Sequence, residues 1–155
     1  MMRSEFDQHM KKIAGDIDGK ALDDNLEHYL NENYGPETDT FNELETLCHK
    51  AVEEGWMCDR EAGDIKFGRV TKPGDETHGL SVDVVSMSDV KGPHHIHTTG
   101  EIGMVMPISE NAKFDGKGRG WYVYPPGSAH YPTVTGGAAL VLYLLPDGQI
   151  EFTGQ

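Results

Sequence analysis

The stretch GPHHIHTTGEIG, residues 92–103, places three histidines and a glutamate within a segment whose composition is otherwise typical of strands and turns. Side chains alternate between the two faces of a strand, so His95 and His97 share one face and His94 points the other way. Two such imidazoles can converge on a single ion. The residues between His97 and Glu101 predict a hairpin turn, which would fold the carboxylate back beside the pair. The stretch therefore predicts a metal site with open positions for water or substrate.

A second element lies downstream in PPGSAH, residues 125–130. Pro125 and Gly127 predict a sharp turn, and His130 follows it on the next strand. In a barrel that strand could lie across from the first motif, which makes His130 a candidate fourth ligand. The alternative is a hydrogen-bonded polar lining that holds no ion.

Glycine and proline divide the chain into two parts. Residues 1–60 contain four Gly and one Pro, whereas residues 61–155 contain fifteen and seven. The first part predicts helices and the second predicts short strands joined by tight turns. We therefore expect an N-terminal helical segment, 1–60, and a barrel, 61–155.

Apolar residues in the first part recur at helical spacing. Thr40 and Glu43 could form a capping box, and Gly55 a C-terminal stop. The predicted helices, three amphipathic segments that need a surface to pack on, cover residues 6–17, 22–30 and 41–52. We expect them to form a layer on the barrel or on a partner subunit.

The second part contains eight short candidate strands separated by turn residues, and this pattern favours a closed sandwich or jelly-roll barrel. The candidates are residues 65–70, 80–87, 94–97, 101–108, 120–125, 130–135, 138–145 and 150–153. Alternation places Tyr122 and Tyr124 on one face of their strand and Trp121 on the other.

Charge and hydropathy exclude several functions. The formal net charge of -13 disfavours nucleic acid and anionic membranes as partners. No apolar run reaches the ~20 residues that span a bilayer, and no signal peptide is recognisable. The two cysteines, Cys48 and Cys58, match no zinc or redox spacing. The default expectation is a cytoplasmic protein with reduced thiols.

The residues Gly92, His95, His97, Glu101, Pro125, Gly127 and His130 resemble the two sequence motifs of the cupin superfamily. Gly92 lies closer to the first histidine than in the usual motif, and Val134 replaces an asparagine that often follows the last one. The resemblance implies a mainly β fold, the double-stranded β-helix (jelly-roll barrel), around one divalent metal. His95, His97, Glu101 and His130 would be its ligands, and the metal could be Fe, Mn, Zn or Ni.

A narrower resemblance covers nearly the whole chain, including the segments 55–70, 78–108, 114–134 and 136–152. They are similar to the small cupins known as 4-hydroxylaminobenzoate lyases of bacterial nitroaromatic degradation. That resemblance implies a lyase that turns 4-hydroxylaminobenzoate into protocatechuate and ammonia. Two other readings remain open: a different metal-cupin reaction on an aromatic acid, such as a dioxygenase or isomerase, and a binding protein without activity.

The chemistry of such a substrate suggests further roles. Glu101 could be a ligand or a proton shuttle, and with His130 it is the candidate catalytic pair. The substrate carboxylate needs a cation, for which Arg69 and Arg119 are candidates. Tyr124 could line the slot for the ring. Asp83 could orient a ligand histidine or face solvent. A homodimer is expected, as is common among cupins.

Overall fold

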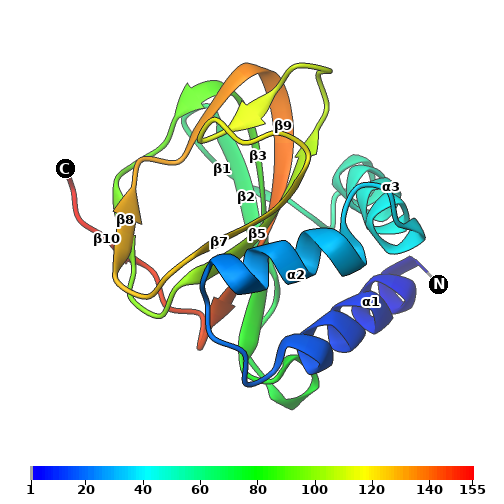
Figure 1. Ribbon diagram of the computed structural model, residues 1–155. Coiled ribbons are helices and arrows are strands. Elements are labelled where there is room, and N and C mark those ends of the chain that lie inside the picture. The colour runs from blue at the N-terminus through cyan, green and yellow to red at the C-terminus, as the bar shows by residue number, and fades with distance from the viewer. Residues whose placement is uncertain (1) are drawn as a thin grey trace.

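The computed structural model describes residues 2–155, and three helices precede all of its strands (Figure 1). They are α1 (Met2–Ile17), α2 (Asp24–Tyr34) and α3 (Asp39–Glu54). All three predicted helices are therefore present, each somewhat longer than its apolar pattern.

Capping residues explain where α2 begins and where α3 begins and ends. The side chain of Asp23 caps α2 by accepting a hydrogen bond from the amide of Leu26. The cap of α3 is Thr38, which accepts from the amide of Phe41, so the predicted capping box of Thr40 and Glu43 is wrong. Gly55 ends α3 in the left-handed conformation, as predicted.

The strands form two sheets. The larger has the order β1-β2-β3-β9-β5-β7, with β6 also paired to β9, and the smaller has the order β10-β4-β8. A short 3-10 helix, η1 (Asp75–Thr77), lies between β2 and β3. The strands are β1 (Arg60–Ala62), β2 (Ile65–Thr71), β3 (Leu80–Lys91), β4 (His95–His97), β5 (Glu101–Pro107), β6 (Lys113–Phe114), β7 (Gly120–Tyr124), β8 (Ser128–His130), β9 (Thr133–Pro146) and β10 (Glu151–Phe152).

The strand pattern differs from the prediction around β9. We expected separate strands at 130–135 and 138–145, but β9 runs through both Gly136 and Gly137. These glycines have positive φ, and the register with β3 shifts between Ser88 and Val90. The glycine pair therefore makes a bulge inside one strand, where we had predicted a break. His130 belongs to β8, a separate short strand.

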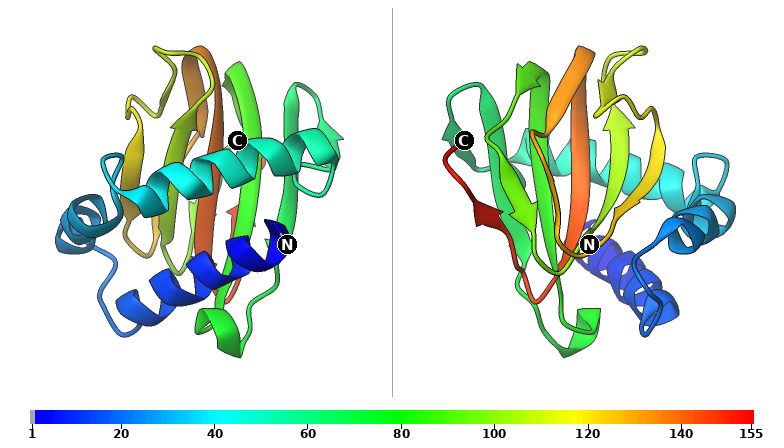
Figure 2. Two further views of the ribbon diagram at one scale, coloured as in Figure 1. Left: turned by 90° about the vertical axis from the view of Figure 1, so that its right-hand side faces the viewer. Right: turned by 60° about the vertical axis from the view of Figure 1, so that its left-hand side comes forward.

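The helices cover one side of the larger sheet (Figure 2). Buried apolar residues of all three helices pack with those of the sheet in one cluster, and a second cluster lies inside the barrel. Trp121 faces the helices and donates its indole N–H to the carbonyl of Tyr34, whereas Tyr122 belongs to the inner cluster. The fold is thus a mainly β jelly-roll barrel with an N-terminal helical layer, as the sequence predicted.

Within residues 2–155, no helix combines the length and the apolar character that crossing a membrane requires.

Candidate metal centre

Three histidines of the smaller sheet meet at one point inside the barrel. His95 on β4 lies directly opposite His130 on β8, and His97 lies two residues further along β4. The Nε2 atoms form a triangle: His95 to His97 is 3.0 Å, His95 to His130 is 2.9 Å and His97 to His130 is 3.0 Å. The structure thus brings together the three histidines that the two sequence motifs singled out.

Glu101 approaches His97 from the other sheet, although it lies outside the group of three whose ligand atoms are all within 4.8 Å of one another. The predicted hairpin is wrong, because β4 pairs with β8 and β10 while β5 pairs with β7 and β9. The turn at Gly100, with a φ of 91°, instead carries the chain from one sheet to the other. Glu101 Oε1 still lies 3.4 Å from His97 Nε2, and its Oε2 accepts a 2.8 Å hydrogen bond from the hydroxyl of Tyr122.

Burial sets the charges of these groups. Burial and the neighbouring imidazoles lower the pKa of His95 to about 4 and that of His97 to about 3. Burial raises the pKa of Glu101 to about 8, and burial and Glu101 raise that of Tyr122 well above its ordinary value. Two histidines are thus held neutral, the form in which imidazole binds metals, and the Tyr122 hydroxyl stays a donor.

The donor set fits a divalent transition metal. A triangle of nitrogens with 3.0 Å edges has a point above its plane that is ~2.1 Å from all three, the usual length of a metal–imidazole bond. The angles at that point are about 90°, as on one face of an octahedron, with room for a carboxylate and further ligands. This triangle is also the one cluster with metal-ligand spacing among the described residues. The fit does not distinguish Fe, Mn, Zn and Ni.

Asp115 supports the centre from outside it, and the sequence analysis missed it. Its Oδ2 lies 2.6 Å from His130 Nδ1 and accepts a 2.6 Å hydrogen bond from the Tyr124 hydroxyl. Its Oδ1 accepts a 2.9 Å hydrogen bond from the amide of Thr133. Burial opposes ionisation of Asp115, but these hydrogen bonds outweigh it and lower its pKa. The residue stands in the sequence FDGKG, which reads only as a turn.

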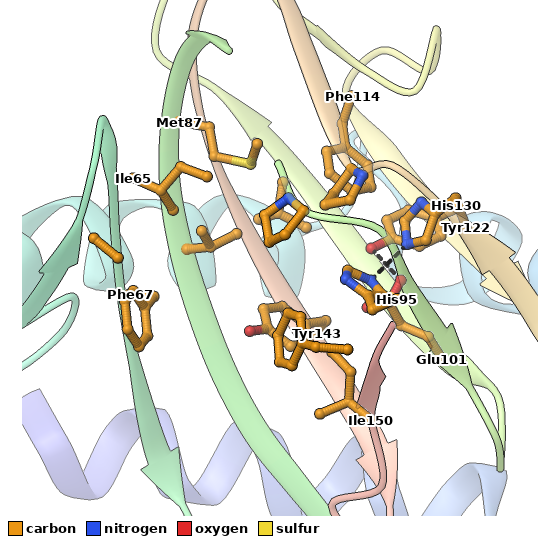
Figure 3. A pocket seen from close by; sticks show the side chains of 16 residues that line it. Ile65, Phe67, Met87, His95, Glu101, Phe114, Tyr122, His130, Tyr143 and Ile150 are labelled. Atoms are coloured by element: carbon orange, nitrogen blue, oxygen red, sulfur yellow. Dashed lines mark hydrogen bonds between the residues drawn. The ribbon is translucent and has the colours of Figure 1, made fainter. Parts of the chain in front are cut away.

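A cavity of about 300 Å³ adjoins the histidines and is mostly apolar. Figure 3 shows His95, His130 and Glu101 together on one side, with Ile65 and Phe67 across from them. The walls come from both sheets and from the C-terminal segment: Ala62, Ile65, Phe67, Val85, Met87, Pro93, His95, Glu101, Phe114, Tyr122, His130, Pro132, Val141, Tyr143, Ile150 and Phe152. Such an apolar space suits a small aromatic ring.

The two candidate arginines lie in different places. Arg69 shares a face of β2 with Ile65 and Phe67 but is not among the residues that line the cavity, and its Nε donates to the carboxylate of Asp83 at 2.9 Å. Asp83 is therefore engaged by Arg69 and by the Ser81 hydroxyl, and it orients no histidine. Arg119 lies on the helical side, where it is bonded to Glu45 of α3, so it is not at the cavity.

Tyr124 and His94, the two remaining residues discussed from the sequence, both have hydrogen-bond partners outside the cavity. Tyr124 is held by Asp115 and stacks on His97, while Tyr122 lines the cavity in its place. His94 points away from the histidine triangle, and its Nδ1 lies 2.6 Å from the Thr153 hydroxyl.

Comparison with known proteins relates the chain to one family. The family model described as PnbB: 4-hydroxylaminobenzoate lyase matches residues 8–152. The chain is 34% identical to a 4-hydroxylaminobenzoate lyase of Pseudomonas putida, over 90% of this chain and 89% of that one. It is 32% identical to a 4-hydroxylaminobenzoate lyase of Nocardioides sp. (strain LMS-CY), over 90% of this chain and 88% of that one.

Solved structures are more distant. A putative acetylacetone dioxygenase from Methylibium petroleiphilum PM1 is 12% identical with a TM-score of 0.47, covering 61% of this chain and 71% of that one. Salicylate 1,2-dioxygenase from Pseudoaminobacter salicylatoxidans, solved with gentisate, is 13% identical with a TM-score of 0.47, covering 74% and 36%. The sequence matches, which extend over almost the whole length, show that this chain belongs to the 4-hydroxylaminobenzoate lyase family.

Proposed function

We propose that this chain is a metal-dependent lyase that converts 4-hydroxylaminobenzoate and water to protocatechuate and ammonia, a step of nitroaromatic degradation. Two relatives at about one-third identity carry the name of this activity. The single observation that carries the proposal here is the triangle of three histidine Nε2 atoms, 2.9–3.0 Å apart, at the wall of an apolar cavity.

The overall reaction balances without an oxidant. The N–O bond, the bond from nitrogen to the ring and the C–H bond at the neighbouring ring carbon break. Two bonds from oxygen to the ring form, the hydrogens end on oxygen and nitrogen, and one water is consumed per ammonia released. The site must therefore favour departure of the hydroxylamine oxygen, deliver oxygen to the ring, and hold the ring still while both happen.

His95, His97, His130 and Glu101 would hold the metal. A divalent cation bound there supplies Lewis acidity toward the hydroxylamine oxygen and lowers the pKa of a coordinated water. The buried imidazoles are neutral, so they offer lone pairs without first losing protons.

Glu101 is the proposed proton carrier. Without a cation nearby its carboxyl keeps a proton at neutral pH, since its pKa is raised to about 8. A cation at the centre favours the ionised form, so the carboxyl can serve as ligand or as proton carrier as its surroundings change. The Tyr122 hydroxyl, 2.8 Å from Oε2, fixes the carboxyl in both states. Because Glu101 lines the cavity, a proton on it can reach the departing oxygen or nitrogen of the substrate.

Arg69 is the proposed partner of the substrate carboxylate. It lies on the cavity face of β2, and Asp83 on β3 faces it across the strand pair while Tyr143 on β9 faces Asp83. Asp83 and the carbonyl of Gly148 use Nε and one Nη, and the other side of the guanidinium is available for a fork-like contact. The apolar walls would hold the ring between this end and the histidines. Arg119 has no part in the proposal because Glu45 holds it on the helical side.

The experiment is turnover under anaerobic conditions. Purified protein, stripped and reloaded with Fe²⁺, Mn²⁺, Zn²⁺ or Ni²⁺, is given 4-hydroxylaminobenzoate, and ammonia and protocatechuate are quantified. We expect the two products in equal amounts, with oxygen from labelled water in the ring. Turnover that requires dioxygen would favour a dioxygenase instead. If none of the four metals supports release of ammonia, the proposal is refuted.

A homodimer also remains a prediction, which light scattering in solution tests.

A further inference from the structure

Asp115 has three hydrogen-bond donors around two carboxylate oxygens. The Thr133 amide donates to Oδ1 at 2.9 Å, the Tyr124 hydroxyl donates to Oδ2 at 2.6 Å, and His130 Nδ1 lies 2.6 Å from the same Oδ2. The position of the residue is fixed by the backbone as well. Its own amide donates to the carbonyl of Thr133 at 2.7 Å, and its φ of 51° is a left-handed conformation that aspartate tolerates.

These contacts determine where His130 carries its proton. An ionised carboxylate can only accept hydrogen bonds, so Nδ1 of His130 must be the protonated nitrogen. In a neutral ring the lone pair then resides on Nε2, which faces His95 Nε2 at 2.9 Å and His97 Nε2 at 3.0 Å. A metal at the triangle needs that lone pair.

His97 offers a contrast within the same triangle. Its Nδ1 is buried without a hydrogen-bond partner, so no neighbour selects its tautomer in this way. His130 is also less buried than His97, and its short strand β8 pairs only with β4. A hydrogen bond to the His130 ring therefore restricts the orientation of this histidine more than the same contact would restrict that of His97.

We propose that Asp115 is a positioning residue of the metal centre, which fixes the His130 tautomer and ring orientation, with Tyr124 holding Asp115 in place. The inference rests on the metal-dependent function proposed above. Partners of this kind on the non-coordinating nitrogen orient the ring and raise its basicity, and losing one typically costs about 10- to 100-fold in metal affinity.

Asp115→Asn tests the point because it changes no shape. An asparagine has one accepting oxygen where three donors converge. If that oxygen stays on the Thr133 amide, the NH₂ group faces His130 Nδ1 and favours the opposite tautomer, with the proton on Nε2. If the side chain flips, NH₂ meets the N–H of Thr133 and one donor is left unpaired. Tyr124→Phe removes one donor and keeps the carboxylate, so it leaves the His130 tautomer unchanged.

The first readout is Zn²⁺ affinity, measured by competition with a chromophoric chelator. We expect binding about 10- to 100-fold weaker in Asp115→Asn than in wild type. Tyr124→Phe should lose less. Asp64→Asn, which removes the same charge at an exposed turn, should match wild type. Equal affinity of Asp115→Asn and wild type would overturn the inference while leaving the metal site standing. A wild-type protein that binds none of Zn²⁺, Fe²⁺, Mn²⁺ and Ni²⁺ would overturn the proposed function and the inference with it.

The second readout needs neither metal nor activity. Nitrogen-15 shifts of the His130 ring in metal-free wild-type protein should show a protonated Nδ1 and a bare Nε2. In Asp115→Asn they should be reversed when the asparagine oxygen stays on the Thr133 amide. A proton on Nε2 in the wild-type protein would overturn the inference even if Asp115→Asn failed to fold.

Discussion

Replacing Gly103 by alanine should displace the Tyr122 side chain from the barrel interior. An added Cβ would overlap Cζ, Cε2 and the hydroxyl oxygen of Tyr122, whose ring lies flat across β5 at this point. The φ of Gly103 is not positive, so the backbone accepts alanine and the steric conflict with the ring is the whole effect. The ring is 1% exposed and packs against Phe114 and Tyr124, so the one direction open to it is the cavity that it lines, away from these two contacts.

The magnitude follows from two losses. Overpacking of a buried site costs about 1–3 kcal/mol. Moving the Tyr122 hydroxyl from Glu101, a 2.8 Å contact, costs about 0.5–1.5 kcal/mol more. We therefore expect Gly103→Ala to lower the free energy of unfolding by about 2–4 kcal/mol, which is about 5–15 °C in Tm for a domain of this size. Turnover should fall as well, because Glu101 loses the contact that fixes its orientation.

The measurement is a double-mutant cycle by urea denaturation. Gly118→Ala is the matched control, since nothing lies within 4 Å of its added Cβ and its φ is not positive. We expect it within about 0.5 kcal/mol of wild type. In a Tyr122→Ala background the clash is gone, so Gly103→Ala should then cost little, giving a coupling of about 1–3 kcal/mol. The reasoning would be refuted if the unfolding free-energy changes of Gly103→Ala and Tyr122→Ala were additive, or if Gly103→Ala were as stable as Gly118→Ala. Either result would show that the Tyr122 ring does not require a glycine at position 103.

Three further predictions concern the cavity, the centre and the helices. The double variant Arg69→Gln/Asp83→Asn should raise KM about 10- to 100-fold in steady-state assays, because the substrate carboxylate loses a charge-assisted hydrogen bond. Asp83 is changed as well so that its carboxylate is not left buried without a partner. Arg119→Gln should leave KM unchanged. His97→Ala should hold below a tenth of an equivalent of metal, and a chelator should lower the Tm of wild type only. Asp16 accepts hydrogen bonds from the hydroxyls of Tyr34 and Tyr29 on α2, and these bonds, chiefly that of Tyr34, lower the pKa of its carboxyl. The stability this contributes is present above the unfolded pKa of ~3.9 and is lost as pH falls through the folded value. Asp16→Asn should therefore flatten the acid limb of a plot of unfolding free energy against pH; an unchanged limb would contradict it.

Local patterns predicted much of the site. The spacing of His95 and His97 determines that both lie on the same face of β4, because alternation along a strand needs no knowledge of the rest of the fold. The same rule correctly separated Trp121 from Tyr122. Helical periodicity likewise identified all three helices, since each presents an apolar face to the sheet.

Features that depend on contacts between distant segments were not predictable in this way. Asp115 reaches His130 because β6 pairs with the start of β9, and nothing in an Asp-Gly turn indicates that pairing. The side of the barrel to which Arg119 belongs depends on α3, more than sixty residues earlier. The Gly136-Gly137 pair has the composition of a turn, and only the continuing ladder with β3 makes it a bulge.

The centre is divided between two sheets of unequal strength. The larger sheet supplies Glu101 from β5, which ladders with β7 and β9 hold on both sides, and Tyr122 from β7 at the edge of that sheet. The smaller sheet supplies all three histidines, yet β4 has three paired residues with β8 and two with β10. Few hydrogen bonds thus hold the part of the barrel that carries most of the proposed metal ligands. A metal that joins His95, His97 and His130 to Glu101 would link the two sheets directly, and its binding energy would add to the stability of the closed barrel. The bonds from the metal to these four residues would then both place the metal beside the substrate and hold together the two sheets that form the cavity.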